Sequence, residues 1–372
     1  MFFEQQYSFA FLATFFIVSV FFSFLINWLF LKYSVNLGVR TPKGEQQVRW
    51  SANVKPAIGG ISFFIVFLIS ISVMGMLPRQ QEMFLDKNLI GILAASCLGF
   101  IIGLADDAYN TNPLVKFIGQ LTCAFILILS DVFIPATGNN AIDYALTVMW
   151  VIGLMNSINM LDNMDAITTS VSICIVLGLL AVIFSQHQEV NSYYVVMLVG
   201  VLGALFGFLY FNWNPAKIFM GDTGSQFLGV FLAALSIVYF WKFKDNDGGI
   251  IELKQFVVPM LMFIVPLIDT ITVTFRRLAR KQSPFVGGKD HITHHLFFYG
   301  FRERQIATMV IVLSLLSIPL SLMLLNDIIE WNWLATFGSF AYFAIVFLLV
   351  QWMYNVGATR KPAEKPREGK DL

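Results

Sequence analysis

Long uninterrupted runs of apolar residues dominate this chain, and polar residues fall mainly in the short segments between them. A membrane-spanning helix needs about 20 mostly apolar residues. This criterion predicts eleven spans, at about 7–31, 57–77, 88–105, 114–130, 144–158, 166–185, 193–211, 224–241, 255–275, 305–325 and 333–354. The predicted fold is therefore an all-α, polytopic integral membrane protein. A single transmembrane domain is expected over residues 1–354, followed by a charged tail over 355–372.

Composition supports this fold class. The chain is 57% hydrophobic and only 13% charged, whereas soluble domains carry about 25% charged residues. A formal net charge of +1 gives no support for a nucleic-acid partner. The three cysteines lie inside apolar runs and are interpreted as packing residues. Because no basic residue precedes the first run and no cleavage site follows it, that run is expected to remain as a span.

The basic residues predict the orientation of the spans. Loops after the odd-numbered spans with their helix margins, together with the C-terminal tail, hold 19 of the 24 lysines and arginines. Basic residues mark the cytoplasmic side of a membrane protein. The N-terminus is therefore predicted outside and the C-terminus inside, which places every unusual polar cluster at the cytoplasmic face.

The first such cluster is the pair Asp106 and Asp107, at the end of the third span. Two adjacent carboxylates at a membrane boundary repel each other, so they favour a cation or a proton partner. A solvated helix end is an equally good interpretation of the pair alone. Lys116, at the start of the fourth span, fits either a membrane-surface anchor or a phosphate contact.

A second cluster follows the fifth span. Spacing of three places Asn156, Asn159 and Asp162 on one helical face, and Asp165 continues it. Amide and carboxylate oxygens at a span end suit a hard divalent cation such as magnesium. A polar helix cap is the alternative.

The stretch Gly221 to Ser225, before the eighth span, can present Asp222 beside exposed backbone N–H groups, an arrangement that fits a metal–diphosphate. An ordinary helix cap is the alternative. Asp269 lies inside the ninth span and is a functional candidate for that reason, although a structural partner such as Arg276 or Arg277 fits as well.

The loop before the tenth span holds three of the four histidines, His291, His294 and His295. Their spacing allows zinc binding, but no cysteine is near. Hydrogen bonds from the imidazoles and from Lys289 to an anionic substrate fit better. His187 stands alone in an outer loop.

Together these motifs resemble the polyprenyl-phosphate N-acetylhexosamine-1-phosphate transferase family. The resemblance runs from about residue 38 to 296. It covers a Pro-Ala-Ile-Gly-Gly opening at 56–60, the Asp-Asp pair, the Asn-x-x-Asn-x-x-Asp stripe, the 219–225 stretch, Pro-x-x-Asp-Thr and the His loop. Within this family, the eleventh span and the charged tail resemble the bacterial branch that uses undecaprenyl phosphate and UDP-N-acetylglucosamine. The pentapeptide transferases of the same family have ten spans.

Two departures from the family pattern stand out. The family usually reads Asp-Gly-x-Asp-Gly after the stripe, whereas Asn163 and Ala166 replace the glycines here. The usual His-x-His-His is one residue longer here, from His291 to His295. The turn after the stripe and the role of each histidine are therefore expected to differ.

The resemblance implies a reaction. Undecaprenyl phosphate attacks the sugar-side phosphorus of a UDP-N-acetylhexosamine, most simply the N-acetylglucosamine form, and UMP leaves. The product starts a cell-envelope polysaccharide such as lipopolysaccharide O-antigen, or serves cell-wall biogenesis. Such transfer depends mainly on positioning and on neutralising phosphate charge.

The resemblance also implies site roles. Asp222 and Asn159 would bind Mg²⁺, with Mn²⁺ as a substitute, and Asp106 and Asp107 would orient or deprotonate the lipid phosphate. Deprotonation is dispensable, because a phosphate monoester with a pKa near ~6 is already mostly dianionic at pH 7. Asp162 and Asp165 would hold the site or contact the nucleotide. The substrate-binding residues would be Lys55, Lys116, Asn156, His291, His294 and His295.

The resemblance further implies the bacterial inner membrane, a cytoplasm-facing site and a homodimer as a compatible assembly. Two alternatives belong to other classes. An ion-coupled transporter would place ionisable groups near the bilayer midplane and show inverted repeats, but only Asp269 intrudes and no repeat is evident. A non-catalytic lipid-binding protein of the same fold is supported only by the missing glycines.

Overall fold

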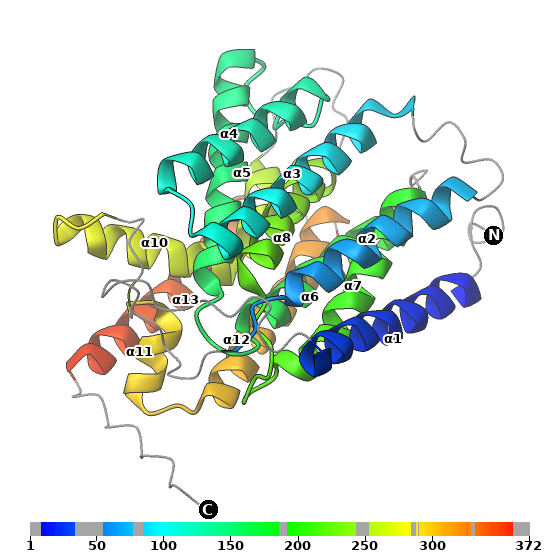
Figure 1. The fold of residues 1–372 in the computed structure, drawn as a ribbon. Coiled ribbons are helices and arrows are strands. Elements are labelled where there is room, and N and C mark those ends of the chain that lie inside the picture. The colour runs from blue at the N-terminus through cyan, green and yellow to red at the C-terminus, as the bar shows by residue number, and fades with distance from the viewer. Residues whose placement is uncertain are drawn as a thin grey trace, which may run out of the picture.

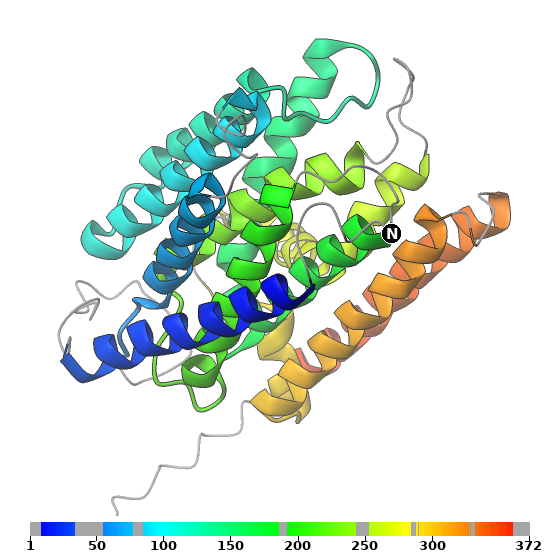
Figure 2. The same ribbon diagram turned by 90° about the vertical axis from the view of Figure 1, so that its right-hand side faces the viewer.

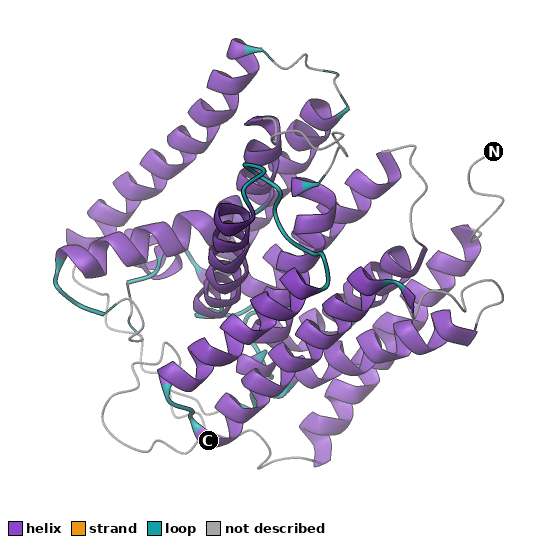
Figure 3. Ribbon diagram, turned by 90° about the horizontal axis from the view of Figure 1, so that it is seen from above, coloured by secondary structure: helices purple, strands orange, loops and turns teal. Residues whose placement is uncertain are grey.

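The computed structural model describes residues 9–33, 55–76, 85–185, 192–242, 253–283, 288, 290–326, 328 and 332–359. This part of the chain is helical throughout, with one isolated β-bridge between Ala57 and Phe219 and no strand (Figure 3). The helices are α1 (Phe9–Tyr33), α2 (Gly59–Met76), α3 (Lys87–Tyr109), α4 (Pro113–Leu129), α5 (Asn140–Leu161), α6 (Ile167–Ser185), α7 (Ser192–Asn212), α8 (Gly221–Ser236), η3 (Ile237–Trp241), α9 (Leu253–Met262), α10 (Ile264–Ala279), α11 (Ile292–Tyr299), α12 (Glu303–Leu325) and α13 (Trp333–Thr359).

The all-α membrane fold predicted from the sequence is confirmed, and each predicted apolar run is helical. Nine helices of the described chain are long and apolar enough to cross a membrane, and the bent pair α9–α10 makes a tenth. The predicted fourth span is α4, an apolar helix of 17 residues. The short helix α11 within the His loop was not predicted. The count of eleven spans, the domain division and the orientation of the termini stay predictions.

The predicted ninth span is broken. Its two helices, α9 and α10, meet at an angle of 82°. Pro259 lies within α9 and Pro266 in the first turn of α10, and proline inside a helix removes a backbone hydrogen bond and favours a kink. In Figure 1, α10 projects sideways from the bundle. This break allows α10 to carry Asp269 toward the His loop.

Helix α8 lies at the centre of the bundle, and α6 and α7 are likewise buried along most of their length. Helices α1, α12 and α13 lie at its periphery, with α12 and α13 along one edge (Figure 2). Small and polar residues at helix contacts are typical of membrane bundles. One example is Asn27 of α1, whose Nδ2 donates to Ser62 Oγ of α2 at 2.9 Å.

Close packing of α3 against α8 brings the Asp-Asp pair to the start of α8. A Cβ on Gly103 of α3 would lie 2.2 Å from the carbonyl oxygen of Asp222. Only glycine permits this approach of the two backbones. The sequence of α3 thereby fixes where its last turn, with Asp106 and Asp107, meets the start of α8.

Candidate active site

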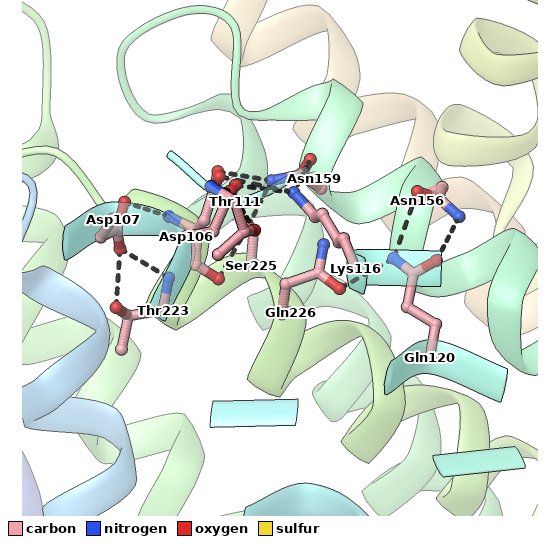
Figure 4. Close-up of polar contacts among 11 residues, drawn as sticks. Asp106, Asp107, Thr111, Lys116, Gln120, Asn156, Asn159, Thr223, Ser225 and Gln226 are labelled. Carbon is pink, nitrogen blue, oxygen red and sulfur yellow. Dashed lines mark hydrogen bonds and ion pairs between the residues drawn. The ribbon is translucent and has the colours of Figure 1, made fainter. Parts of the chain in front are cut away.

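Four helices contribute the side chains at the centre of the site. Lys116 of α4 lies between Asp106 of α3, Asn159 of α5 and Asp222 of α8 (Figure 4). Its Nζ is 3.1 Å from Asp106 Oδ2, 3.2 Å from Asn159 Oδ1 and 3.4 Å from Asp222 Oδ2. Asn159 Nδ2 in turn donates to Asp222 Oδ1 at 2.8 Å. We call Lys116, Asn159 and Asp222 the charged layer.

Asp106 is held by its own chain as well as by Lys116. Its Oδ1 accepts the backbone N–H of Thr111 at 2.9 Å and the Thr111 hydroxyl at 2.7 Å. The other oxygen, Oδ2, is the one that faces Lys116. This arrangement fixes one carboxylate edge toward the ammonium group.

Asp107 contacts α8. Its Oδ1 accepts the backbone N–H of Asp222 at 3.1 Å, and its Oδ2 accepts the N–H and hydroxyl of Thr223 at 2.8 and 2.6 Å. The carboxylate therefore caps the α8 N-terminus, where unpaired N–H groups and the helix dipole favour negative charge. The sequence predicted exposed N–H groups here for a diphosphate. That prediction is wrong for these two groups, because Asp107 occupies them.

The turn before α8 requires glycine. Gly221 has φ of +77°, and a Cβ there would lie 2.7 Å from both the Ala57 carbonyl oxygen and Asp107 Oδ2. Glycine adopts this left-handed conformation at little cost. The tight turn predicted from the sequence is confirmed, and it delivers Asp222 into the first turn of the helix.

A second polar layer lies one helical turn further from these helix ends. It consists of Gln120 of α4, Asn156 of α5 and Gln226 of α8, and we call it the amide layer (Figure 4). Gln120 Nε2 donates to Asn156 Oδ1 at 3.2 Å and to Gln226 Oε1 at 3.0 Å. Asn156 Nδ2 donates back to Gln120 Oε1 at 2.9 Å and to the Ile152 carbonyl at 2.9 Å. Asn156 was predicted to bind substrate, but its amide is engaged within the protein.

The residues after α5 diverge from the predicted helical stripe, because α5 ends at Leu161. Burial, together with the charges of Asp222 and Asp107, raises the pKa of Asp162 to about 7. Asp162 thus belongs electrostatically to the same acidic cluster. Asp165 instead holds the loop before α8, accepting Asn214 Nδ2 at 3.1 Å and the Ala216 N–H at 2.9 Å. Of its two predicted roles, the geometry favours holding the site.

The histidines separate into different environments. His291 Nδ1 lies 2.8 Å from Asp269 Oδ2, which pairs the intramembrane carboxylate with the His loop. His294 is 2% exposed, and burial lowers its pKa to about 3. His295 stacks on Tyr354 of α13 at 3.5 Å, and burial and the Arg276 charge lower its pKa to about 4. His294 and His295 are therefore neutral at pH 7, and His295 packs against the last helix.

Asp290 anchors the segment before α11. Burial favours its neutral form, but hydrogen bonds from Arg277 at 2.8 and 2.6 Å and its positive charge outweigh burial and hold the pKa of Asp290 below its usual value. Arg277 was considered as a partner of Asp269, and the structure pairs it with Asp290 instead. Lys289 and His187 lie outside the described residues.

Lys55 lies at the edge of the same region. Its Nζ is 5.1 Å from the centre of the Phe219 ring. The adjoining backbone pairs with the segment before α8, because the Gly59 N–H donates to the Phe219 carbonyl at 3.1 Å. Lys55 therefore stands beside the turn that carries Asp222, and its predicted role in substrate binding stays a prediction.

Sequence reasoning missed Thr111, Gln120, Thr223 and Gln226. A signal was available for two of them, since Gln120 follows Lys116 by four residues and Gln226 follows Asp222 by four. Residues four apart share a helical face, so the two glutamines are expected on the faces that carry the charged layer. Thr111 and Thr223 each donate an N–H and a hydroxyl to one aspartate of the Asp-Asp pair, and these contacts leave no comparable pattern.

Comparisons with known proteins identify relatives of the chain. Residues 89–240 match the model of glycosyl transferase family 4. The chain is 27% identical to a probable undecaprenyl-phosphate N-acetylglucosaminyl 1-phosphate transferase of Bacillus subtilis, over 91% of this chain and 89% of the relative. It is 29% identical to a decaprenyl-phosphate N-acetylglucosaminephosphotransferase of Mycobacterium leprae, over 68% of this chain and 69% of the relative.

A third relative completes the identification. The chain is 31% identical to a phospho-N-acetylmuramoyl-pentapeptide-transferase of Clostridium beijerinckii, over 75% of this chain and 83% of the relative. The chain belongs to glycosyl transferase family 4, whose matched relatives are polyprenyl-phosphate phosphosugar transferases. The family resemblance seen in the sequence is thereby confirmed, and the coarse reaction is phosphosugar transfer to a polyprenyl phosphate.

Proposed function

We propose that the protein transfers N-acetylglucosamine-1-phosphate from UDP-N-acetylglucosamine to undecaprenyl phosphate and releases UMP. A lipid phosphate oxygen attacks the sugar-side phosphorus, and the bond from that phosphorus to the bridging oxygen breaks. The leaving oxygen stays with UMP, and the product is a lipid diphosphate sugar that begins a cell-envelope polysaccharide. The names of the relatives from Bacillus subtilis and Mycobacterium leprae support this donor.

The observation that carries the proposal is the charged layer. Phosphoryl transfer between two anionic substrates requires neutralised charge and fixed geometry, with little covalent help from the protein. Lys116 supplies a cation whose position is set by Asp106, Asn159 and Asp222. A phosphate oxygen at this layer would therefore meet a held ammonium group.

The donor set fits a magnesium ion. Oxygens of Asp106, Asn159 and Asp222 converge on one cationic group, the Lys116 ammonium, within 3.1 to 3.4 Å. Mg²⁺ prefers oxygen ligands and completes its shell with phosphate oxygens and water. In this proposal Asp222 with Asn159 would hold Mg²⁺, or Mn²⁺ in its place, which would supply positive charge beside the donor diphosphate. Lys116 would then serve the phosphate oxygens.

The two adjacent aspartates take different roles in this proposal. Asp106 orients Lys116 toward the reacting phosphates, whereas Asp107 positions Asp222 by capping α8. Neither has to act as a base, because the lipid phosphate is already largely dianionic at pH 7. In this proposal the site works at the cytoplasmic face of the bacterial inner membrane, which is the side that the distribution of basic residues predicts for these helix ends.

The experiment uses purified full-length protein with undecaprenyl phosphate, radiolabelled UDP-N-acetylglucosamine and magnesium. Labelled lipid and UMP are expected in equal amounts, and chelation of the metal is expected to abolish both. Asp222→Asn should shift the magnesium concentration for half-maximal rate upward by about tenfold or more. The conservative change keeps the size of the side chain and one oxygen that can accept from Asn159, so a folding defect is not expected.

Three results would contradict the proposal. Transfer from another UDP-sugar in preference to N-acetylglucosamine would change the donor and keep the reaction class. Full activity in the chelator, or an unchanged magnesium requirement in Asp222→Asn, would remove the metal from this site. Thr308→Ala on the exposed face of α12 serves as the control variant, because its hydroxyl bonds only the carbonyl one turn earlier.

A further inference from the structure

The two departures from the family pattern touch each other in this fold. Asn163 stands where the family usually has glycine, and Thr293 lies in the lengthened stretch between His291 and His294. The Thr293 hydroxyl donates to Asn163 Oδ1 at 2.5 Å. A glycine at position 163 has no side chain to accept this bond, so the contact depends on both changes.

Asn163 joins the end of one helix to the start of another. Its Oδ1 accepts from Thr293 in the first turn of α11, while its Nδ2 donates to the Met160 carbonyl in the last turn of α5 at 2.9 Å. Thr293 is only 2% exposed. Water therefore cannot readily replace the amide as partner of the Thr293 hydroxyl, and a buried unpaired hydroxyl is costly.

A second attachment holds the same turn of α11. Asp269 Oδ1 accepts the Ile292 N–H at 2.9 Å, and Asp269 Oδ2 lies 2.8 Å from His291 Nδ1. With Nδ1 engaged by a carboxylate, Nε2 is the ring nitrogen left to contact a ligand. The His294 ring lies 5.5 Å from the His291 ring and nearly perpendicular to it. Asp269 and Asn163 thus fix this pair of imidazoles from two sides.

We propose that Asn163 and Thr293 are a positioning pair that sets affinity for the sugar nucleotide. The pair fixes the His loop against the α5–α6 turn, and hence His291 and His294 relative to Asp162. This inference rests on the proposed function, because it takes these histidines as contacts of the donor. It predicts an effect on donor binding, since the pair lies outside the charged layer where the phosphate is transferred.

The test is a double-mutant cycle with Thr293→Val, Asn163→Gly and the double variant. Each single variant should raise KM for UDP-N-acetylglucosamine by about tenfold, the size of one buried hydrogen bond, with kcat changed less than about threefold. The double variant should be no worse than the poorer single variant, because both changes remove one shared contact. Thr293→Ser keeps the hydroxyl and should retain the wild-type KM.

Several outcomes overturn the inference. Additive effects of the two changes, an unchanged KM in either single variant, or a loss confined to kcat would each contradict it. A lower unfolding temperature with normal KM would show a purely structural contact. Asn163→Gly tests the contact from the half-buried partner if Thr293→Val fails to fold. Absence of turnover in the wild-type protein with every sugar nucleotide would contradict the proposed function itself, which distinguishes the two failures.

Discussion

Asp107 holds Thr223 by two hydrogen bonds to a single carboxylate oxygen, one from the backbone N–H at 2.8 Å and one from the hydroxyl at 2.6 Å. Thr223 follows Asp222 directly, so this contact sets the start of α8 and the direction of the Asp222 side chain. The second carboxylate of the Asp-Asp pair thus acts on the site through the backbone of another helix.

Asp107→Ala is therefore expected to lower both stability and rate. Removing the cap leaves two N–H groups unpaired, at a cost of about 2 kcal/mol, and a displaced Asp222 should slow turnover by about a hundredfold. Thr223→Val removes only the hydroxyl contact and should cost about 1 kcal/mol. Unfolding temperature and kcat in detergent measure both effects. Thr223→Ser keeps the hydroxyl and is the control. A lower kcat in Thr223→Val than in Asp107→Ala would refute the role of Asp107 as the cap that positions Asp222.

Two substitutions in the amide layer should differ in their effect on stability, because they leave different numbers of buried polar atoms without a hydrogen bond. Gln226 Nε2 is buried and has no partner in the described part of the chain. Gln226→Leu removes this group together with one acceptor, so a change of less than about 1 kcal/mol is expected. Asn156→Leu leaves both polar atoms of Gln120 short of a partner and should cost about 2–3 kcal/mol.

Unfolding temperatures of the two amide variants, measured side by side in detergent, check this order. Asn156→Leu should also lower kcat, because Asn159 lies one turn further along α5 and would shift with it. Equal losses of stability in the two variants would show that the amide layer does not act through paired hydrogen bonds.

His295 gives a pH-dependent contribution to stability. Its pKa is about 4 in the folded protein and about 6.5 when unfolded, so the unfolded chain binds more protons between these values. The contribution of His295 to the free energy of unfolding is therefore complete above about pH 6.5. It falls by up to about 1.4 kcal/mol per pH unit as the pH drops toward 4. In the His295→Gln variant the glutamine has no titratable group, so this contribution does not change with pH.

The unfolding temperature of the wild-type protein should therefore approach that of His295→Gln on acidification from pH 7 to pH 5. The difference between the two proteins is the quantity to measure, since Asp162, with a pKa raised to about 7, changes stability in the opposite direction. A constant difference across this range would contradict the burial of a neutral His295.

Ala166 occupies the second position where the family usually has glycine, and it keeps the glycine-like conformation with φ of +66°. The left-handed backbone costs a residue with a Cβ about 1–2 kcal/mol. The buried methyl group contributes about 0.8 kcal/mol in return. Ala166→Gly should therefore change stability by less than about 1 kcal/mol, whereas Ala166→Val should lower it by about 2 kcal/mol or more. Thermal unfolding distinguishes these outcomes.

The sequence predicts the membrane helices well, because each requires a long apolar run whatever its neighbours are. It predicts Asp106, Lys116, Asn159 and Asp222 as one polar group, since all four lie at helix ends on one predicted face. The different roles of Asp106 and Asp107 depend on where α8 packs. The residues next to them in the sequence do not indicate this packing, so the roles could not be predicted.

Other features depend on tertiary contacts with no local pattern. The engagement of Asn156 with Gln120 reflects the register of α4 against α5. The 82° break at α9–α10 lies within a segment that the sequence predicts as one span. The short helix α11 lies within a segment that the sequence predicts as a loop. The two lost glycines were recognised as departures, but only the fold shows that Asn163 contacts Thr293 while Ala166 preserves the turn.

The packing of α11 against α13 bears on how the protein is made. His295 stacks on Tyr354, and a Cβ on Gly357 would lie 2.4 Å from the His295 carbonyl oxygen. Both partners belong to α13, the last helix of the described residues, whereas the charged layer is complete once α8 has been synthesised. During synthesis at the ribosome, the residues of the charged layer are therefore all present before α13, and the His295 side of α11 gains this packing partner only when α13 has been made.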